Sequence, residues 1–287
     1  MTDLLHALRP YQWTKNALVF AALVFARDLG EPDKVLLALA AFAIFCAASS
    51  SVYLFNDLAD RERDRVHPRK RERPIAAGRV STGVAAGTGL VLGGGALLGA
   101  AAINWQLTAV IGGYLLLQLS YNLGLKQIAI VDALCVAAGF LLRAIAGVVA
   151  IAEPMSPWLL VCTSFASVFI SFAKRRHEFT TLADSSSHRE SLSGYTVALL
   201  DQFLVVCAGA TMLSYALYTV DEGTIAKFGN ERLLLTLPLV MYGLFHYLAM
   251  VQRDEATGDP SRALLTDRPL ALTMLLYGLL VVLLLYV

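Results

Sequence analysis

Acidic side chains gather between Asn56 and Asp64, directly after an apolar run of membrane length and directly before a basic segment. On a helix that advances about 100° per residue, Asn56, Asp57, Asp60 and Asp64 lie within roughly 100° of arc, so one face presents an amide and three carboxylates. Carboxylate and amide oxygens are the hard ligands that Mg²⁺ prefers. The spacing therefore predicts a divalent-cation site at Asp57, Asp60 and Asp64, and with it a phosphorylated substrate.

The basic segment from Arg65 to Gly78 places Lys70, Arg71 and Arg73 beside these carboxylates. Cationic donors next to metal-binding carboxylates suit a diphosphate. The plainer interpretation is a solvated helix end with interleaved Arg and Asp, which is common after membrane spans. We favour the functional interpretation, because ionisable residues crowded at the end of a membrane helix are functional candidates by default.

The composition indicates that a membrane protein carries these residues. With 57% hydrophobic residues, 16% charged residues and a mean hydropathy of +0.63, the chain of 287 residues is too apolar for an ordinary soluble domain. Runs long enough to cross a hydrocarbon core of ~30 Å predict an all-α bundle of about nine transmembrane helices, one domain over residues 1–287. The runs lie near residues 15–29, 35–55, 82–101, 105–122, 131–151, 157–173, 197–219, 233–250 and 268–287.

Lys and Arg are distributed unevenly between the two sides of this bundle. With a cytoplasmic N-terminus, 18 of the 23 lie on the inner side, four lie on the outer side and Arg143 lies within a span. The positive-inside rule thus favours a cytoplasmic N-terminus. The polar loops at residues 56–81, 121–132 and 174–196 then emerge on the cytoplasmic side, and we expect them to form one active site there.

Small residues within the spans are expected to serve packing. Glycines recur at four-residue spacing between residues 83 and 99, which lets helices approach closely. The four cysteines are dispersed through apolar runs without CxxC spacing, so neither a disulfide framework nor a zinc site is predicted.

Polar residues near or within the spans have two interpretations each. Lys15 and Asn16 can reach a phosphate from the inner end of the first span, or Lys15 can be an interfacial lysine beside Trp13. Arg143 lies about three turns into an apolar helix, where an unpaired charge is costly. It either pairs with an acid or reaches a substrate phosphate. Asp132 is about 16 Å away along a straight helix, which disfavours direct pairing of the two.

The pattern NDxxDxxxD at residues 56–64, followed by HPxKRxRPIAAG at residues 67–78, resembles the first signature of the UbiA superfamily of intramembrane prenyltransferases. The resemblance extends across the chain. It implies a bundle of nine helices that uses Mg²⁺, with Mn²⁺ as the alternative, and an isoprenoid diphosphate whose lipid chain lies in a lateral groove.

The second acidic signature of the superfamily is incomplete in this chain. Most members carry another DxxxD, but Asp132 is followed four residues later by Val136. The segment from Tyr121 to Asp132 reads YxxxLKxxxxxD, which resembles the decaprenyl-phosphate phosphoribosyltransferase branch. Further resemblances to this branch are RPYQWTKN at residues 9–16, FLLRAIAG at residues 140–147 and AKRR at residues 173–176.

The branch implies a glycosyltransferase. It would join 5-phosphoribosyl 1-diphosphate to a polyprenyl phosphate, decaprenyl phosphate in that branch, in a bacterial inner membrane. The product, a polyprenyl-phosphoryl 5-phosphoribose, would be a precursor of cell-wall arabinan. A donor with two phosphorylated positions needs cations in two places, and the chain offers residues 70–73 and residues 174–176.

Two alternative functions are weighed against this one. The first is transfer of a prenyl group from its diphosphate to an aromatic or other acceptor, which needs fewer cations. The second is a transporter with an acidic gate, which predicts polar residues along a path through the midplane. The spans are almost wholly apolar apart from Arg143, so a lipid-handling enzyme fits better.

The expected site combines these residues. Asp57, Asp60, Asp64 and Asp132 are the expected catalytic residues, and the first three bind the cation. The expected substrate-binding residues are Lys15, Asn16, Asn56, Lys70, Arg71, Arg73, Tyr121, Lys126, Arg143, Lys174, Arg175 and Tyr195. The lipid bilayer is an expected partner, nucleic acid is not, and the sequence leaves a homo-oligomer open.

Overall fold

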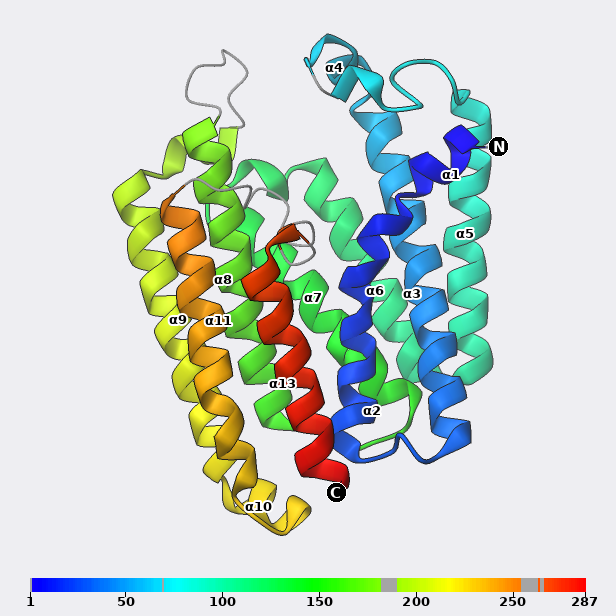
Figure 1. Cartoon of the computed structure of the whole chain (residues 1–287). Coiled ribbons are helices and arrows are strands. Elements are labelled where there is room, and N and C mark those ends of the chain that lie inside the picture. Colours follow the sequence, from blue (N-terminus) through cyan, green and yellow to red (C-terminus); the bar gives the residue numbers. More distant parts are fainter. Residues whose placement is uncertain (1, 69, 182–189, 254–262, 264–265) are drawn as a thin grey trace. The chain divides into compact units, whose positions relative to one another are not determined.

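The computed structural model of the chain describes residues 2–68, 70–181, 190–253, 263 and 266–287 (Figure 1). Every regular element in these ranges is a helix, so the all-α prediction is confirmed. The chain divides into two compact units, Met1–Leu123 with Leu142–Pro154, and Gly124–Leu141 with Met155–Val287. We call them unit 1 and unit 2. The expectation of a single domain over residues 1–287 stays a prediction.

Unit 1 carries the acidic segment and the predicted N-terminal spans. A long helix, α3, contacts α1, η1, α5 and α6 within this unit. The elements are α1 (Thr2–Leu8), η1 (Pro10–Phe20), α2 (Ala21–Ala26), α3 (Pro32–Ala59), α4 (Arg61–Val66), η2 (Lys70–Glu72), α5 (Thr82–Ile103), α6 (Trp105–Leu123) and the second part of α7 (Val131–Ala150).

Unit 2 begins with η3 and the first part of α7. Within it, α8 packs on α9, and α11 contacts α8, α9 and α13 (Figure 1). The element before α7 is η3 (Leu125–Gln127). The elements after α7 are α8 (Pro157–Thr181), η4 (Glu190–Gly194), α9 (Val197–Val220), α10 (Glu222–Phe228), η5 (Arg232–Thr236), α11 (Leu237–Gln252) and α13 (Arg268–Tyr286).

Seven helices within the described ranges are long and apolar enough to cross a membrane. They correspond to seven of the nine predicted runs. The predicted run at residues 15–29 is divided between η1 and α2, and the run at residues 105–122 forms α6. Neither of these two is among the seven. The chain is therefore a polytopic membrane protein, and nine spans remain a prediction.

The element η1 is long for a 3₁₀ helix, a form in which side chains three residues apart line up. Trp13, Asn16 and Val19 follow this spacing, and the last two are fully buried. Trp13 Nε1 donates a hydrogen bond to Ser50 Oγ at 3.0 Å, and Asn16 Nδ2 donates to Ser49 Oγ at 3.3 Å. These hydrogen bonds hold η1 against Ser49 and Ser50 of α3.

Glycines let helices of unit 1 approach closely at two places. A Cβ atom on Gly93 would lie 2.9 Å from Ser51 Oγ, and the same serine donates a hydrogen bond to the carbonyl of Gly89 at 2.7 Å. A Cβ atom on Gly147 would lie 2.0 Å from the carbonyl oxygen of Val19. The predicted packing role is confirmed for Gly89 and Gly93.

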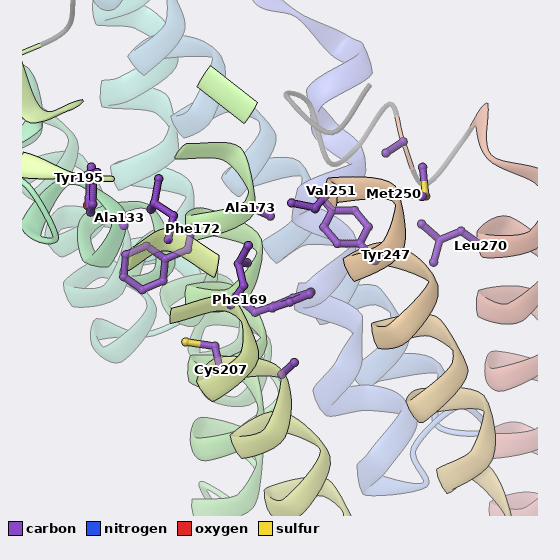
Figure 2. Packing of buried hydrophobic residues seen from close by; sticks show 14 of the residues in the cluster. Ala133, Phe169, Phe172, Ala173, Tyr195, Cys207, Tyr247, Met250, Val251 and Leu270 are labelled. Atoms are coloured by element: carbon purple, nitrogen blue, oxygen red, sulfur yellow. The ribbon is translucent and has the colours of Figure 1, made fainter. Parts of the chain in front are cut away.

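The core of unit 2 is aromatic and aliphatic (Figure 2). Phe172 packs against Phe203 with ring centroids 4.9 Å apart, and the ring of Tyr195 meets the ring of Phe172 edge-on. Phe169 and Tyr247 form a second edge-on pair. These contacts join α8, α9 and α11 and place Tyr195 in the core. The four cysteines are free thiols.

Candidate active site

Two carboxylates of the acidic segment converge on one guanidinium group in unit 1. Asp57, near the end of α3, and Asp64, in α4, are both buried. Nη1 of Arg73 lies 3.0 Å from Asp57 Oδ1 and 2.7 Å from Asp64 Oδ2. The helical spacing thus brings two of the three predicted cation ligands together, and Arg73 bridges them.

Arg9 supplies a second cation to the same carboxylate. Its Nη2 lies 2.6 Å from Asp57 Oδ1, and its guanidinium carbon lies 5.0 Å from the centroid of the Tyr53 ring. Its backbone has φ 54° and ψ 59°, a left-handed conformation that is uncommon for residues other than glycine. Burial lowers the pKa of Arg9, but Asp57, together with Tyr11 and Tyr53, more than offsets this, so the pKa is raised and Arg9 stays charged.

Asp60 and Asn56 complete this part of the acidic segment. Asp60 is half-buried and lies at the break between α3 and α4, with φ −91° and ψ 4°. The amide oxygen of Asn56 accepts a hydrogen bond from Nδ2 of Asn122, which also donates to the carbonyl of Gln118 at 2.9 Å. The contact of Asp60 with a cation stays a prediction.

The other predicted phosphate ligands of unit 1 lie at varied depths. Lys70 and Arg71 are exposed in η2, Lys15 is half-buried in the middle of η1, and Tyr121 is half-buried near the end of α6. Lys70 and Arg71 are thus accessible to a phosphate, whereas Asn16 is fully buried.

Asn16 forms part of a network around Arg143. Nε of Arg143 donates to Asn16 Oδ1 at 2.7 Å, and Nη2 donates to the Tyr114 hydroxyl at 3.3 Å. The guanidinium carbon lies 5.1 Å from the centroid of Phe45 and 5.0 Å from that of Tyr114. Neutral polar groups and aromatic faces therefore surround the intramembrane charge, an arrangement that neither sequence interpretation of Arg143 included.

Asp132 forms a second buried cluster, in unit 2. Its carboxylate is fully buried, with Oδ2 2.5 Å from Nε of Arg175, whose side chain is 1% exposed. The hydroxyl of Tyr195 donates to Asp132 Oδ1 at 2.9 Å and accepts from the backbone N–H of Ile130 at 2.5 Å. Burial raises the pKa of Tyr195, which keeps this hydroxyl protonated as a donor. Arg175 also contacts Glu178.

The rest of the basic run at the end of α8 has internal partners as well. Nε of Arg176 lies 2.9 Å from Asp201 Oδ1, and Nη1 donates to the carbonyl of Val251 at 2.8 Å. Lys174 Nζ lies 3.9 Å from Glu178 Oε1. Lys126 is half-buried in η3. The binding of substrate by Lys126, Lys174, Arg175 and Tyr195 stays a prediction.

The residues around Asp57 suit a divalent cation. Within the described ranges no three His, Cys, Asp or Glu side chains form a ready metal cluster. Asp57 and Asp64 nevertheless share one cation, Arg73, through the oxygen atoms that hard cations prefer. An ion in that place would meet two buried carboxylates, so the donor set fits such a metal.

Sequence reasoning missed several residues of these clusters, namely Arg9, Tyr114, Asn122 and Glu178. Arg9 opens the RPYQWTKN segment, yet no pattern in it indicates a partner 48 positions away. Tyr114 had a weak signal, because a charge such as Arg143 in an apolar span needs partners. The other two are ordinary residues near helix ends, and we find no sequence signal for them.

Comparison with known proteins decides the family. The model of the UbiA prenyltransferase family matches residues 17–266. The chain belongs to the UbiA prenyltransferase family. Among curated members, it is 34% identical to the decaprenyl-phosphate phosphoribosyltransferase of Corynebacterium glutamicum over 99% of this chain and 87% of the relative. It is 37% identical to that of Mycobacterium tuberculosis over 94% of this chain and 89% of the relative.

Two solved structures share the fold of this chain. A UbiA homologue from Archaeoglobus fulgidus, bound to GPP and Mg²⁺, superposes with a TM-score of 0.73 at 18% identity and covers 97% of this chain and 96% of the homologue. A structure of digeranylgeranylglyceryl phosphate synthase superposes with a TM-score of 0.69 at 15% identity, covering 99% of this chain and 98% of that one.

Proposed function

We propose that this membrane transferase moves 5-phosphoribose from 5-phosphoribosyl 1-diphosphate to a polyprenyl phosphate. The observation that carries the proposal is the identity of 34% and 37% with curated decaprenyl-phosphate phosphoribosyltransferases over nearly the whole chain. The products are polyprenyl-phosphoryl 5-phosphoribose and diphosphate. Decaprenyl phosphate is the proposed acceptor, and cell-wall arabinan is the proposed destination of the product.

Asp57 and Asp64 are the proposed ligands of a divalent cation, and Asp60 is the third candidate. Mg²⁺ is the proposed ion, with Mn²⁺ as a substitute, and the solved neighbour that is bound to GPP and Mg²⁺ supports this choice. Bound there, the cation supplies positive charge that stabilises the departing diphosphate. The exposed Lys70 and Arg71 bind phosphate oxygens of the donor.

The reaction breaks the bond between ribose C1 and the diphosphate oxygen, and the electron pair leaves with the diphosphate. Positive charge develops on C1, and an oxygen of the lipid phosphate attacks it to form the new bond. This oxygen is already anionic, so the chain needs no strong general base. Its residues act by positioning the two phosphates and by neutralising charge.

Asp132 and Arg175 have a positioning role in this proposal rather than a catalytic one. Both are fully buried, and both oxygens of Asp132 have partners in unit 2. Tyr195 ties the carboxylate to the backbone at Ile130, a residue with φ +69° that lies three residues after η3 and directly before α7. The cluster therefore holds the turn that carries Lys126.

The proposed location is the bacterial inner membrane, with the N-terminus and the segment from Arg61 to Arg79 on the cytoplasmic side. The distribution of Lys and Arg supports this orientation. Lys70→Cys in right-side-out vesicles tests it. We expect no labelling by an impermeant maleimide until the membrane is opened, and labelling of intact vesicles would reverse the orientation.

Product analysis tests the reaction. The purified protein in detergent is given Mg²⁺, decaprenyl phosphate and 5-phosphoribosyl 1-diphosphate labelled in the ribose. We expect a labelled lipid with the mass of the phosphoribosylated product, and no such lipid with Asp57→Asn. Turnover of a prenyl diphosphate with an aromatic acceptor, without labelled lipid, would replace the proposal with prenyl transfer.

A further inference from the structure

Arg73 occupies the place between Asp57 and Asp64 that the proposed cation would take. One nitrogen atom, Nη1, contacts a carboxylate oxygen of each residue, at 3.0 Å and 2.7 Å. A guanidinium group and a divalent cation cannot both lie between the same two oxygens. Binding of the ion therefore has to move Arg73 away from at least one carboxylate.

We propose that Arg73 is an internal counter-ion of the metal site, which neutralises Asp57 and Asp64 before the cation binds and is released when it binds. Two carboxylates that share a site repel each other when both are ionised, so the empty site needs a cation. Arg73 supplies it from the loop after α4. The inference rests on the proposed function, because it concerns the same site.

The partial exposure of Arg73 keeps the free-energy cost of the exchange low. Its side chain is 29% exposed, against 2% for Asp57 and 4% for Asp64, so water can hydrate the released guanidinium. A part-exposed pair contributes little free energy compared with a fully buried one. The free energy lost when the two contacts break is therefore small enough for the binding of a divalent ion to compensate for it.

Arg9 keeps Asp57 neutralised during this exchange. It contacts the same oxygen, Oδ1, at 2.6 Å, but it does not bridge to Asp64. Its stacking on Tyr53 and its left-handed backbone fix it in place. Arg73 is thus the exchanging cation and Arg9 the permanent one. Released Arg73 remains close to the carboxylates, where a phosphate group of the donor can bind it.

Removal of an internal competitor should strengthen metal binding in the absence of substrate. We expect Arg73→Gln to bind Mn²⁺ about fivefold more tightly than the wild-type protein, the factor that corresponds to a part-exposed ion pair. Mn²⁺ is titrated into the full chain in detergent and followed by its electron paramagnetic resonance signal. The Mn²⁺ affinity of Arg73→Lys should lie between those of the wild type and Arg73→Gln, because one ammonium group neutralises the carboxylates without the planar fork of a guanidinium group.

Arg65→Gln is the matched control, because it removes one positive charge from the same region without touching Asp57 or Asp64. Arg65 pairs with the exposed Glu62. We expect wild-type Mn²⁺ affinity in this variant. An affinity of Arg73→Gln equal to or weaker than that of Arg65→Gln would overturn the proposal. If Arg73→Gln does not fold, Arg73→Lys decides, and wild-type affinity in that variant would overturn it.

A second measurement separates the exchange from a merely structural role. With EDTA, Arg73→Gln should unfold at a lower temperature than the wild type, because Asp64 loses its contact with Arg73 and Asp57 keeps only its contact with Arg9. Added Mn²⁺ should then raise the unfolding temperature of the variant by more than that of the wild type. An equal rise in both proteins would contradict the exchange. Tighter Mn²⁺ binding without any labelled lipid product would refute the proposed reaction and leave the exchange standing.

Discussion

The two buried acidic clusters differ in the exposure of the arginines that neutralise them. In unit 1, Asp57 pairs with Arg9 and Arg73, whose side chains are 18% and 29% exposed. In unit 2, Asp132 pairs with Arg175, which is 1% exposed. An arginine that touches water can leave its carboxylate, whereas a fully buried one would become an uncompensated charge. The first cluster is therefore suited to exchange with a metal ion, and the second to fixing the fold.

This difference gives a physical meaning to the incomplete second acidic signature. Where most superfamily members are expected to carry two aspartates, this chain has Asp132 and Val136. The remaining carboxylate is bound on one side by Arg175 and on the other by Tyr195. Because Arg175 is almost fully buried and cannot be released into water, this aspartate is suited to anchoring unit 2 and not to binding a dication.

The largest expected effect is on the stability of unit 2. Asp132→Asn leaves Arg175 buried with only Glu178 as its acidic partner among the described contacts, so we expect the free energy of unfolding to fall by about 3 kcal/mol. Titration with SDS measures it. The double variant Asp132→Leu with Arg175→Met should regain most of the loss. A loss below about 1 kcal/mol in the single variant would remove the distinction between the clusters.

The next effect is on turnover rather than on stability. Asp57→Asn should lower the rate of lipid product formation on the order of a hundredfold or more, because it removes a ligand of the cation that stabilises the leaving group. Its unfolding free energy should change by about 1 kcal/mol at most, since water can hydrate Arg73 and Arg9 keeps its stacking on Tyr53. Near-normal turnover would refute the assignment of the metal to unit 1.

A smaller effect is expected from Tyr195→Phe. The substitution removes the donor to Asp132, which is fully buried, and the acceptor for the N–H of Ile130, which is an exposed residue. We expect a loss of about 1–2 kcal/mol in unfolding free energy, with Mn²⁺ affinity unchanged. A marked loss of Mn²⁺ affinity would instead place Tyr195 and Asp132 at the metal.

The smallest effect belongs to the surface pair of Arg65 and Glu62. Their side chains are 44% and 72% exposed, and the pair spans one helical turn. Arg65→Gln should change the unfolding free energy by no more than about 0.5 kcal/mol and leave turnover unchanged. A larger change would show that the charge of Arg65, or its hydrogen bond to the carbonyl of Ala76, contributes without direct contact to the carboxylates.

The sequence predicted what periodicity and hydropathy determine. The apolar runs match the helices, and the helical spacing of Asp57 and Asp64 brings both to one cation. The first run departs from this pattern, because η1 adopts 3₁₀ geometry over residues that hydropathy alone cannot distinguish from an α-helix.

The sequence did not predict which charged residues pair across different helices. The sequence predicts a phosphate-binding role for the basic run at residues 174–176, which stays a prediction. It could not show that Arg175 and Arg176 have Asp132 and Asp201 as partners inside unit 2. Local sequence cannot show that a charge pairs with one on another helix. Arg143 illustrates the same limit, because its contacts with Asn16 and Tyr114 depend on how three elements pack.

The central claim is that a divalent cation binds at Asp57 and Asp64 and not at Asp132. Mn²⁺ binding to three proteins tests it most directly: the wild type, Asp57→Asn, and the double variant Asp132→Leu with Arg175→Met. We predict that Asp57→Asn loses the bound signal and that the double variant keeps wild-type affinity. Retention of the signal in Asp57→Asn together with its loss in the double variant would contradict the account.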